Sequence, residues 1–172
     1  MRTVVLQRHH PGLVEVMAER RRLGLDRHDE LWGGELHTAP GPTFEHGSVN
    51  SDLMDVLKRR GKPRGLRATT ACNVGTPTNY RVPDGGLHHP GASGTWLPTA
   101  ALVAEVLSPG DETYDKFGHW DAHGVEEVVV ADPATRTVRV WQRQDGHLVE
   151  TGTSSLLEVT GGELEAEIDW PA

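Results

Sequence analysis

An apolar run over residues 100–107 constrains the fold of this chain more than any other feature. It reads Ala-Ala-Leu-Val-Ala-Glu-Val-Leu and is followed by the stop signal Ser108-Pro109-Gly110. Small and aliphatic residues in such a stretch are typical of a β-strand that is covered on both faces. Glu105 is the exception, because an ionised carboxylate in such a strand costs free energy unless a cation or a hydrogen-bond donor meets it. We therefore expect Glu105 either to reach water at the strand end or to meet a metal ion or a basic partner.

Hydrophobic periodicity places further elements on both sides of this strand. The spacing of apolar residues predicts one helix over residues 12–23 and another that begins at residues 42–46 and ends near Gly61. A strand or hairpin is expected at residues 30–37, with its turn or bulge at Gly33-Gly34. The remaining expected elements are strands at residues 67–74, 79–84, 125–131, 137–141, 147–150 and 156–159 and a helix at residues 111–124. This order predicts an α/β fold built on a mixed sheet.

Length and composition bound the class of protein. A chain of 172 residues is long enough to form one domain with a buried core. With 20 Gly and 11 Pro it should contain many turns, and the Gly- and Pro-rich stretch 84–98 is expected to be an exposed loop. No apolar stretch approaches the roughly 20 residues that span a bilayer, and the N-terminus lacks the features of a secretory signal. A single cysteine, Cys72, excludes an internal disulfide, so we expect a cytoplasmic protein.

The charge balance argues against one class of nucleic-acid-binding protein. The formal net charge is −8, from 17 Lys and Arg against 25 Asp and Glu, whereas proteins that coat nucleic acid rely on basic surfaces. A nuclease is not excluded, because its metal site is itself acidic. One basic cluster is present at residues 58–67. It is either a solvated helix end whose cations complement the helix dipole or a contact for a phosphate backbone.

Three charged residues occur in an order that suits metal-assisted phosphodiester hydrolysis. Asp84 precedes Glu105 by about one strand and a loop, and Lys116 opens the next segment. Carboxylates on neighbouring strand ends can hold Mg²⁺ through oxygen ligands, together with a backbone carbonyl such as that of Val106. The metal would polarise the phosphate and acidify a bound water, and Lys116 would steady the attacking hydroxide or the charge on phosphorus. The same spacing also arises by chance, so a purely structural role is the alternative.

Other catalytic chemistries find less support. The histidine pairs His9-His10 and His88-His89 lack the spacing of a zinc site, and no cysteine pair is available to complete one. The chain has no Gly-x-Ser-x-Gly segment to form the nucleophile elbow of a serine hydrolase. Its glycine pairs lack the strand-to-helix setting of a phosphate-binding loop. Zinc and serine hydrolases are therefore not favoured.

A longer pattern surrounds Glu105. Residues 102–116 read Leu-Val-Ala-Glu-Val-Leu-Ser-Pro-Gly-Asp-Glu-Thr-Tyr-Asp-Lys, and together with residues 120–133 they resemble the signature of the Uma-two family of restriction endonucleases. Upstream, the segments that resemble this family are its "DGEL" strand at residues 31–36, its helix start at residues 45–47 and its "rPD" segment at residues 81–84. The resemblance spans positions 12–160, which is most of the chain.

The resemblance implies a fold, a site and a substrate. The family belongs to the PD-(D/E)XK nuclease superfamily, a restriction-endonuclease-like fold in which helices flank a mixed central β-sheet. Asp84 and Glu105 match its metal-binding acids, and Lys116 matches its helix lysine. Glu35 and His46 match positions that line the same cleft. The implied cofactor is Mg²⁺ or Mn²⁺, the implied substrate is DNA, and a homodimer is expected by analogy with other nucleases of this fold.

Three positions depart from the family pattern. The superfamily lysine usually lies two residues after the second acid, where this chain has Leu107, so Lys116 must reach back from the following helix. Gly85-Gly86 stand where the family continues a β-branched strand, and they would form a flexible tether or let nucleic acid approach closely. Trp32-Gly33 stand where an acidic residue often precedes the Gly-Glu pair, which makes the match of Glu35 less specific.

The leading hypothesis is a magnesium-dependent endonuclease-like protein that hydrolyses DNA phosphodiester bonds. The alternative from another class is a catalytically inactive nuclease-like scaffold that acts as a binding or regulatory module, which the net charge of −8 and the displaced lysine favour. A third possibility is a hydrolase of a small phosphate ester. An acidic surface would suit such a substrate better than it would suit duplex DNA.

Overall fold

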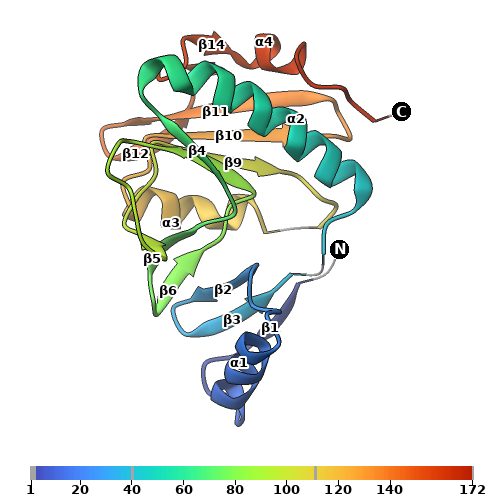
Figure 1. The fold of residues 1–172 in the computed structure, drawn as a ribbon, viewed down its shortest axis with the longest axis vertical. Coiled ribbons are helices and arrows are strands. Elements are labelled where there is room, and N and C mark those ends of the chain that lie inside the picture. The colour runs from blue at the N-terminus through green and yellow to red at the C-terminus, as the bar shows by residue number, and fades with distance from the viewer. Residues whose placement is uncertain (1–2, 40, 111, 172) are drawn as a thin grey trace.

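Two six-stranded β-sheets dominate the computed structural model, which describes residues 3–39, 41–110 and 112–171 (Figure 1). In spatial order, the first sheet contains β1 (Val4–Leu6), β3 (Glu35–Thr38), β2 (Asp29–Trp32), β6 (Asn79–Arg81), β5 (Asn73–Thr76) and β8 (Trp96–Leu97). The second sheet contains β12 (His147–Glu150), β11 (Thr137–Gln144), β10 (Glu127–Asp132), β9 (Leu102–Val106), β7 (Gly85–His88) and β4 (Arg67–Thr70). Two short strands, β13 (Thr153–Ser154) and β14 (Val159–Thr160), pair with each other.

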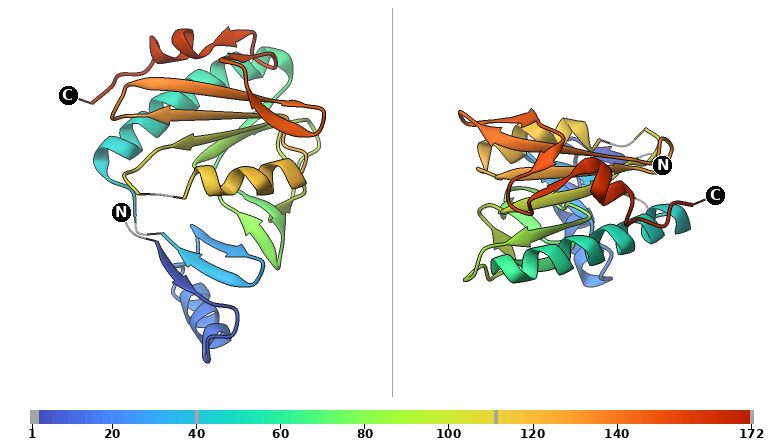
Figure 2. Two further views of the ribbon diagram at one scale, coloured as in Figure 1. Left: turned by 180° about the vertical axis from the view of Figure 1, so that it is seen from behind. Right: turned by 90° about the horizontal axis from the view of Figure 1, so that it is seen from above.

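The second sheet is the mixed sheet that the sequence predicts. β9 runs parallel to β10, while the other neighbouring strands of this sheet are antiparallel. Every residue of β9 is buried, as expected of a strand covered on both faces. Helix α2 (Phe44–Gly61) packs on one face and α3 (Phe117–Ala122) on the other (Figure 2). The prediction of an α/β fold with a mixed central sheet flanked by helices is therefore confirmed.

Alternation along β9 decides what each side chain contacts. The even-numbered residues of this strand belong to the apolar cluster under α2. Val103 belongs instead to the cluster that contains Trp120 of α3. Because successive side chains of a strand point to opposite faces, Glu105 shares the face of Val103. The one carboxylate of the strand thus lies on the side where the chain returns as α3.

Helix α2 forms where the spacing of apolar residues predicts it. Oγ1 of Thr43 accepts a hydrogen bond from the backbone N–H of His46 and caps the first turn. A 3₁₀ turn, η1 (Lys62–Arg64), follows Gly61. The predicted apolar face is buried and comprises Val49, Leu53, Val56 and Leu57. Burial of each such side chain contributes on the order of 2 kcal/mol, so the helix that carries His46 is firmly seated on the sheet.

The expectation of an exposed loop at residues 84–98 is wrong for its first part. Gly85–His88 form the buried strand β7, which pairs with β4 and β9. A Cβ atom on Gly85 would lie 2.3 Å from Sδ of Met54, so the missing side chain leaves room for α2 to pack closely. The glycine pair is therefore a helix-contacting strand and not a flexible tether. Residues 89–95 and Pro98 are the exposed part of this stretch.

The other elements follow the sequence with local differences. Helix α1 (Leu13–Arg22) and the β2–β3 hairpin form as predicted. The strand expected at residues 67–74 is divided into β4 and β5, because Ala71 has a φ of +32° and turns the chain. The helix expected at residues 111–124 is a 3₁₀ turn, η2 (Tyr114–Lys116), followed by α3, and Asp111 lies outside the described residues.

The C-terminal part of the chain differs from the predicted strand. Of the strand expected at residues 156–159, only the short β14 begins there, and the helix α4 (Gly161–Glu165) follows it. Thr160 and Glu163 form the capping box that starts this helix. Among the residues that the structure describes, no helix is both long enough and apolar enough to cross a membrane.

The first sheet is a layer that the sequence analysis did not anticipate. Strands β1–β3 precede α2 in the chain, whereas β5, β6 and β8 follow it. The two groups meet where Leu31 of β2 pairs with Tyr80 of β6. After β6 the chain passes from the first sheet to the second over residues 82–84 and continues as β7.

Candidate active site

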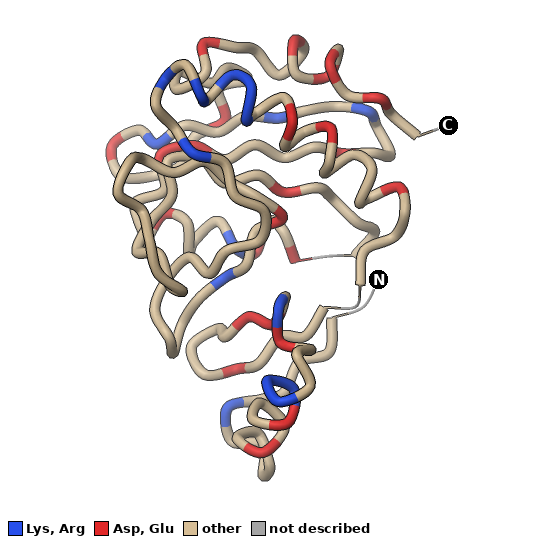
Figure 3. The backbone as a smooth tube through the Cα atoms, in the orientation of Figure 1, with Lys and Arg blue, Asp and Glu red and all other residues tan. Residues whose placement is uncertain are grey.

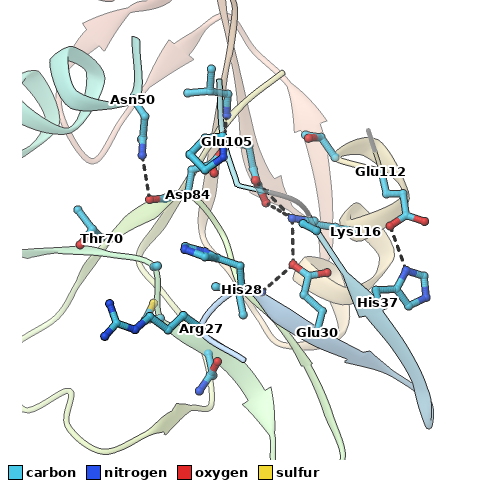
Figure 4. Close-up of a pocket in the computed structure, with 18 of the residues that line it drawn as sticks. Arg27, His28, Glu30, His37, Asn50, Thr70, Asp84, Glu105, Glu112 and Lys116 are labelled. Carbon is cyan, nitrogen blue, oxygen red and sulfur yellow. Dashed lines mark hydrogen bonds and ion pairs between the residues drawn. The ribbon is translucent and has the colours of Figure 1, made fainter. Parts of the chain in front are cut away.

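The structure brings the three charged residues singled out in the sequence into one pocket (Figure 4). The pocket has a volume of about 670 Å³ and is lined by residues of both sheets. Asp84 reaches it from the start of β7, Glu105 from β9 and Lys116 from η2. Val106 and His46 line it as well. Side chains that are far apart in the chain thus converge.

Glu105 is almost completely buried, with 2% of its surface exposed. Nζ of Lys116 lies 3.2 Å from its Oε1. Burial raises the pKa of Glu105 to about 8; the ammonium group of Lys116 opposes this shift, and the carboxylates of Asp84 and Glu30 reinforce it. We expected Glu105 either to reach water at the strand end or to meet a metal ion or a basic partner. The structure shows a basic partner, Lys116.

Lys116 contacts two carboxylates at once. Its Nζ lies 3.0 Å from Oε1 of Glu30 and 3.2 Å from Oε1 of Glu105, and 13% of its side chain is exposed. Burial alone would lower the pKa of Lys116, but the neighbouring carboxylates raise it above its ordinary value. The lysine therefore remains an ammonium ion, and it reaches back from η2 to β9 as the departure from the family spacing requires.

Glu30 is a residue of this site that the sequence analysis missed. It lies on β2, is 6% exposed, and accepts hydrogen bonds from Nε1 of Trp32 at 2.6 Å and from the Val82 amide at 2.8 Å. The resemblance pointed instead to Glu35, which lies on β3, is partly exposed and does not line the pocket. The sequence carries no comparable signal for Glu30, because it opens the segment expected at residues 30–37 and is not flanked by apolar residues on both sides.

Asp84 is held by hydrogen bonds to both of its oxygens. Oδ2 accepts the backbone N–H of Val106 at 2.8 Å, and Oδ1 lies 3.1 Å from Nε2 of His46. Its backbone carbonyl accepts a hydrogen bond from Nδ2 of Asn50 at 3.3 Å. Burial acts to raise the pKa of Asp84, but the contacts with His46 and Val106 outweigh it and hold this pKa below its ordinary value. Asp84 is therefore ionised, while Glu105 tends to keep its proton.

A second contact ties the first sheet to the segment that carries Lys116. Nδ1 of His37 lies 3.0 Å from Oε2 of Glu112, and the His37 ring stacks on Trp32 with 4.3 Å between ring centroids. His37 belongs to β3, whereas Glu112 precedes η2. This pair and the contact between Glu30 and Lys116 thus join the first sheet to η2 and the residues before it.

The charge of the pocket fits a divalent cation. Glu30, Asp84 and Glu105 set three carboxylates against the one ammonium group of Lys116, and Asp84 raises the pKa of Glu105 because like charges face each other. Within residues 3–39, 41–110 and 112–171, no three acidic, histidine or cysteine side chains are arranged to hold a metal ion together. Carboxylate oxygens such as those of Asp84 and Glu105 are the donors that Mg²⁺ prefers.

The mixed sheet and the acid–acid–lysine set in its pocket define a protein of the restriction-endonuclease-like class. The model of a family described as "Putative restriction endonuclease" matches residues 19–170. The chain belongs to this family, Uma2, and the resemblance found in the sequence is thereby confirmed. A comparison with curated proteins gave no match.

Two solved structures are similar to this chain. One is the crystal structure of "a putative nuclease belonging to DUF820" from Anabaena variabilis ATCC 29413, with a TM-score of 0.63 and 20% sequence identity over 80% of this chain and 89% of that one. The other is the cryoEM structure of a DrdV–DNA complex, with a TM-score of 0.43 and 20% identity over 73% of this chain and 12% of that one. At this level of identity, the first structure supports the fold alone.

Proposed function

We propose that this protein is a metal-dependent endonuclease that hydrolyses phosphodiester bonds in DNA. The observation that carries the proposal is that Asp84, Glu105 and Lys116 line one pocket from three separate parts of the chain. Membership of a family described by restriction endonuclease activity supports the reaction class.

Mg²⁺ or Mn²⁺ is the proposed cofactor. Asp84 and Glu105 would hold it, with the backbone carbonyl of Val106 as a further oxygen ligand. When bound, the ion would polarise the scissile phosphate and make a bound water more acidic. The hydrogen bond from the Val106 amide to Asp84, at 2.8 Å, fixes that carboxylate against the backbone of β9 before any ligand arrives.

Lys116 would act through its positive charge. Because its pKa is raised by the carboxylates around it, it keeps its proton at neutral pH and is unsuited to act as a general base. Its N–H groups can instead donate to a phosphate oxygen or orient the attacking water. The ammonium charge would then stabilise the negative charge that develops on phosphorus. Glu30 would be the positioning residue for this group.

His46 would be the positioning residue for Asp84. Its two ring nitrogens contact different partners, with Nε2 at 3.1 Å from Oδ1 of Asp84 and Nδ1 at 3.0 Å from Oγ of Ser108. An imidazole ring held at both nitrogens has little freedom to rotate. It therefore keeps the Asp84 carboxylate in one orientation, and such preorganisation favours ligand binding and catalysis.

A plasmid-nicking assay tests this function directly. Wild-type protein should nick supercoiled DNA with Mg²⁺ or Mn²⁺ and lose that activity when a chelator is added. Glu105→Ala should be inactive, whereas Glu35→Ala, which changes a residue outside the pocket, should behave as the wild type does. Nicking that survives Glu105→Ala, or that never appears with either metal, would remove the enzymatic claim.

The inactive scaffold is the second candidate, and one observation favours it. Lys116 contacts Glu105 at 3.2 Å and so already compensates the buried carboxylate that a metal would use. Titration calorimetry with Mg²⁺ separates the two candidates. An enzyme should give a binding heat that disappears in Asp84→Asn and Glu105→Gln, and a scaffold should give no such heat.

The molecular setting is part of the same proposal. Residues 1–172 would form one restriction-endonuclease-like domain, and the protein would act in the cytoplasm. A homodimer would present two pockets to the two strands of a duplex. Sedimentation measurements with and without duplex DNA would reveal the stoichiometry.

A further inference from the structure

We propose that the loop of residues 26–28 binds the DNA backbone beside the reacting phosphate, with Arg27 as its principal phosphate contact. The inference rests on the proposed function, because it names the surface that would hold the substrate of the same pocket. The loop joins α1 to β2 and so belongs to the first-sheet part of the chain. Glu105 lies on the second sheet, so a substrate in the pocket would be held from both sides.

The loop contributes to the lining of the candidate active site. Arg27 and His28 line the pocket that also contains Asp84, and Figure 4 shows them on the opposite side of it from Asp84 and Asn50. Both residues are exposed. The guanidinium group and the imidazole ring are therefore accessible to a ligand that enters between the two sheets.

Arg27 differs from the neighbouring arginines in its ion pairing. Within the described part of the chain, Arg27 has no ion-pair partner, whereas the three arginines at the end of the preceding helix are each compensated. Those pairs are Arg20–Asp29 at 2.6 Å, Arg21–Asp26 at 3.6 Å and Arg22–Glu19 at 2.6 Å. The positive charge of Arg27 therefore remains available for an anion beside a pocket that is otherwise acidic.

The basic cluster at residues 58–67 is the rival surface for a phosphate backbone. Three of its six cations are compensated, because Arg59 and Arg60 contact Glu167 and Arg64 contacts Glu158. The cluster begins at the C-terminal end of α2 (Figure 3). This helix has 18 residues, which corresponds to a length of about 27 Å, and His46 lies at its other end. A contact on the helical part of the cluster, such as Lys58, would therefore lie far from the reacting phosphate.

The arrangement fits a polynucleotide better than a small phosphate ester. The carboxylates of the pocket repel phosphate groups, so a substrate must be attracted by cations next to them. The planar fork of arginine matches two oxygens of one phosphate. From across the pocket, Arg27 can hold a phosphate that neighbours the one being hydrolysed. A monoester has no second phosphate for such a contact.

The salt dependence of DNA binding tests this inference. Fluorescence anisotropy with a labelled duplex oligonucleotide, without divalent metal, gives the association constant over a series of salt concentrations. We expect Arg27→Ala to reduce the slope of log K against log salt by about one and to weaken binding roughly fivefold to tenfold at moderate salt. Arg27→Lys should retain the slope, because it retains the charge. Lys58→Ala removes an exposed cation of the rival cluster at the far end of α2 and should change neither quantity.

Each outcome decides for or against the loop. An unchanged slope in Arg27→Ala, a reduced slope in Lys58→Ala alone, or no duplex binding by the wild type would overturn the inference. A melting temperature equal to that of the wild type confirms that the variants are folded. Because binding is measured without metal, Arg27-dependent binding by a protein that never cleaves would support the loop while it refutes the proposed nuclease activity.

Discussion

Nζ of Lys116 lies 3.0 Å from Oε1 of Glu30, so a carboxylate of the first sheet holds the lysine that faces the strands of the second. Glu30 is itself fixed, because the Val82 amide donates to the same oxygen at 2.8 Å. The two sheets thus share one network of charges at the pocket. A substitution of Glu30 should therefore change the position of Lys116 in the pocket.

We expect Glu30→Gln to slow DNA cleavage by about tenfold or more, mainly through kcat. The amide keeps the size of the side chain but removes the charge that positions the ammonium group, and misplaced electrostatic groups act on the transition state. Steady-state cleavage rates of an oligonucleotide measure the effect. Glu35→Gln is the matched control, since Glu35 does not line the pocket, and its rate should match the wild type. Equal losses in both variants would contradict the role given to Glu30.

The buried proton of Glu105 should make the stability of the metal-free protein depend on pH. Its pKa is 4.5 in an ordinary setting and about 8 in the folded protein. Between these values the folded state binds more protons than the unfolded state, so the free energy of unfolding falls as the pH rises. The stabilisation is complete below pH 4.5 and is lost as the pH passes about 8, at a rate of at most about 1.4 kcal/mol per pH unit.

Chemical denaturation of the wild type and of Glu105→Gln over this pH range measures that effect. The amide cannot titrate, so the difference between the two proteins isolates Glu105 from the ten histidines of the chain. We expect the stability of the wild type to fall relative to that of the variant as the pH rises. Parallel curves would show that Glu105 has the same pKa in both states.

Cation binding should depend on the same proton. A carboxyl group must lose its proton before it can bind Mg²⁺, and burial raises the pKa of Glu105 to about 8. At limiting Mg²⁺, cleavage should therefore increase by about tenfold per pH unit below pH 8 and level off above it. Calorimetry in buffers of different ionisation heat should detect about one proton released per ion bound at neutral pH. Asp84 adds little to this release, because its pKa is already lowered.

Close packing at β7 gives a prediction about stability alone. A Cβ atom on Gly86 would lie 2.7 Å from the carbonyl oxygen of Leu102, so Gly86→Ala should lower the free energy of unfolding by about 1–3 kcal/mol. Gly118 of α3 has nothing within 4 Å of the position where a Cβ would be. Gly118→Ala should therefore raise the free energy of unfolding by about 0.5–1 kcal/mol. Urea denaturation measures both, and a stabilising Gly86→Ala would refute the packing argument.

Local patterns were sufficient for the elements that carry most of the predicted site. The apolar run around Glu105 identified a strand buried on both faces, and the apolar spacing from Val49 to Leu57 identified the buried face of α2. Both depend on residues that are close in the chain, which is why periodicity reveals them. Lys116 was singled out by its place after the two acids and then by the family resemblance, and the structure places it beside Glu105.

The features that were missed depend on distant parts of the chain. Gly85 and Gly86 have the composition of a loop, and they form a buried strand because Met54 packs against Gly85 and the Leu102 backbone lies against Gly86. Glu30 enters the site because β2 pairs with β6, which lies beyond α2 in the sequence. Such pairings leave no periodic signal in one sequence. The first sheet and its contribution to the pocket were therefore visible only in three dimensions.

Asp84 occupies the last position of the short segment, residues 82–84, that carries the chain from one sheet to the other. Its carboxylate nevertheless accepts the Val106 amide of β9 at 2.8 Å, the strand that also carries Glu105. Both acids are thus tied to the second sheet, whereas the Glu30 carboxylate that contacts Lys116 belongs to the first. We expect a movement of one sheet against the other to displace Lys116 before it separates the two acids, so that a poorly fitting duplex would be cleaved slowly even when it binds well.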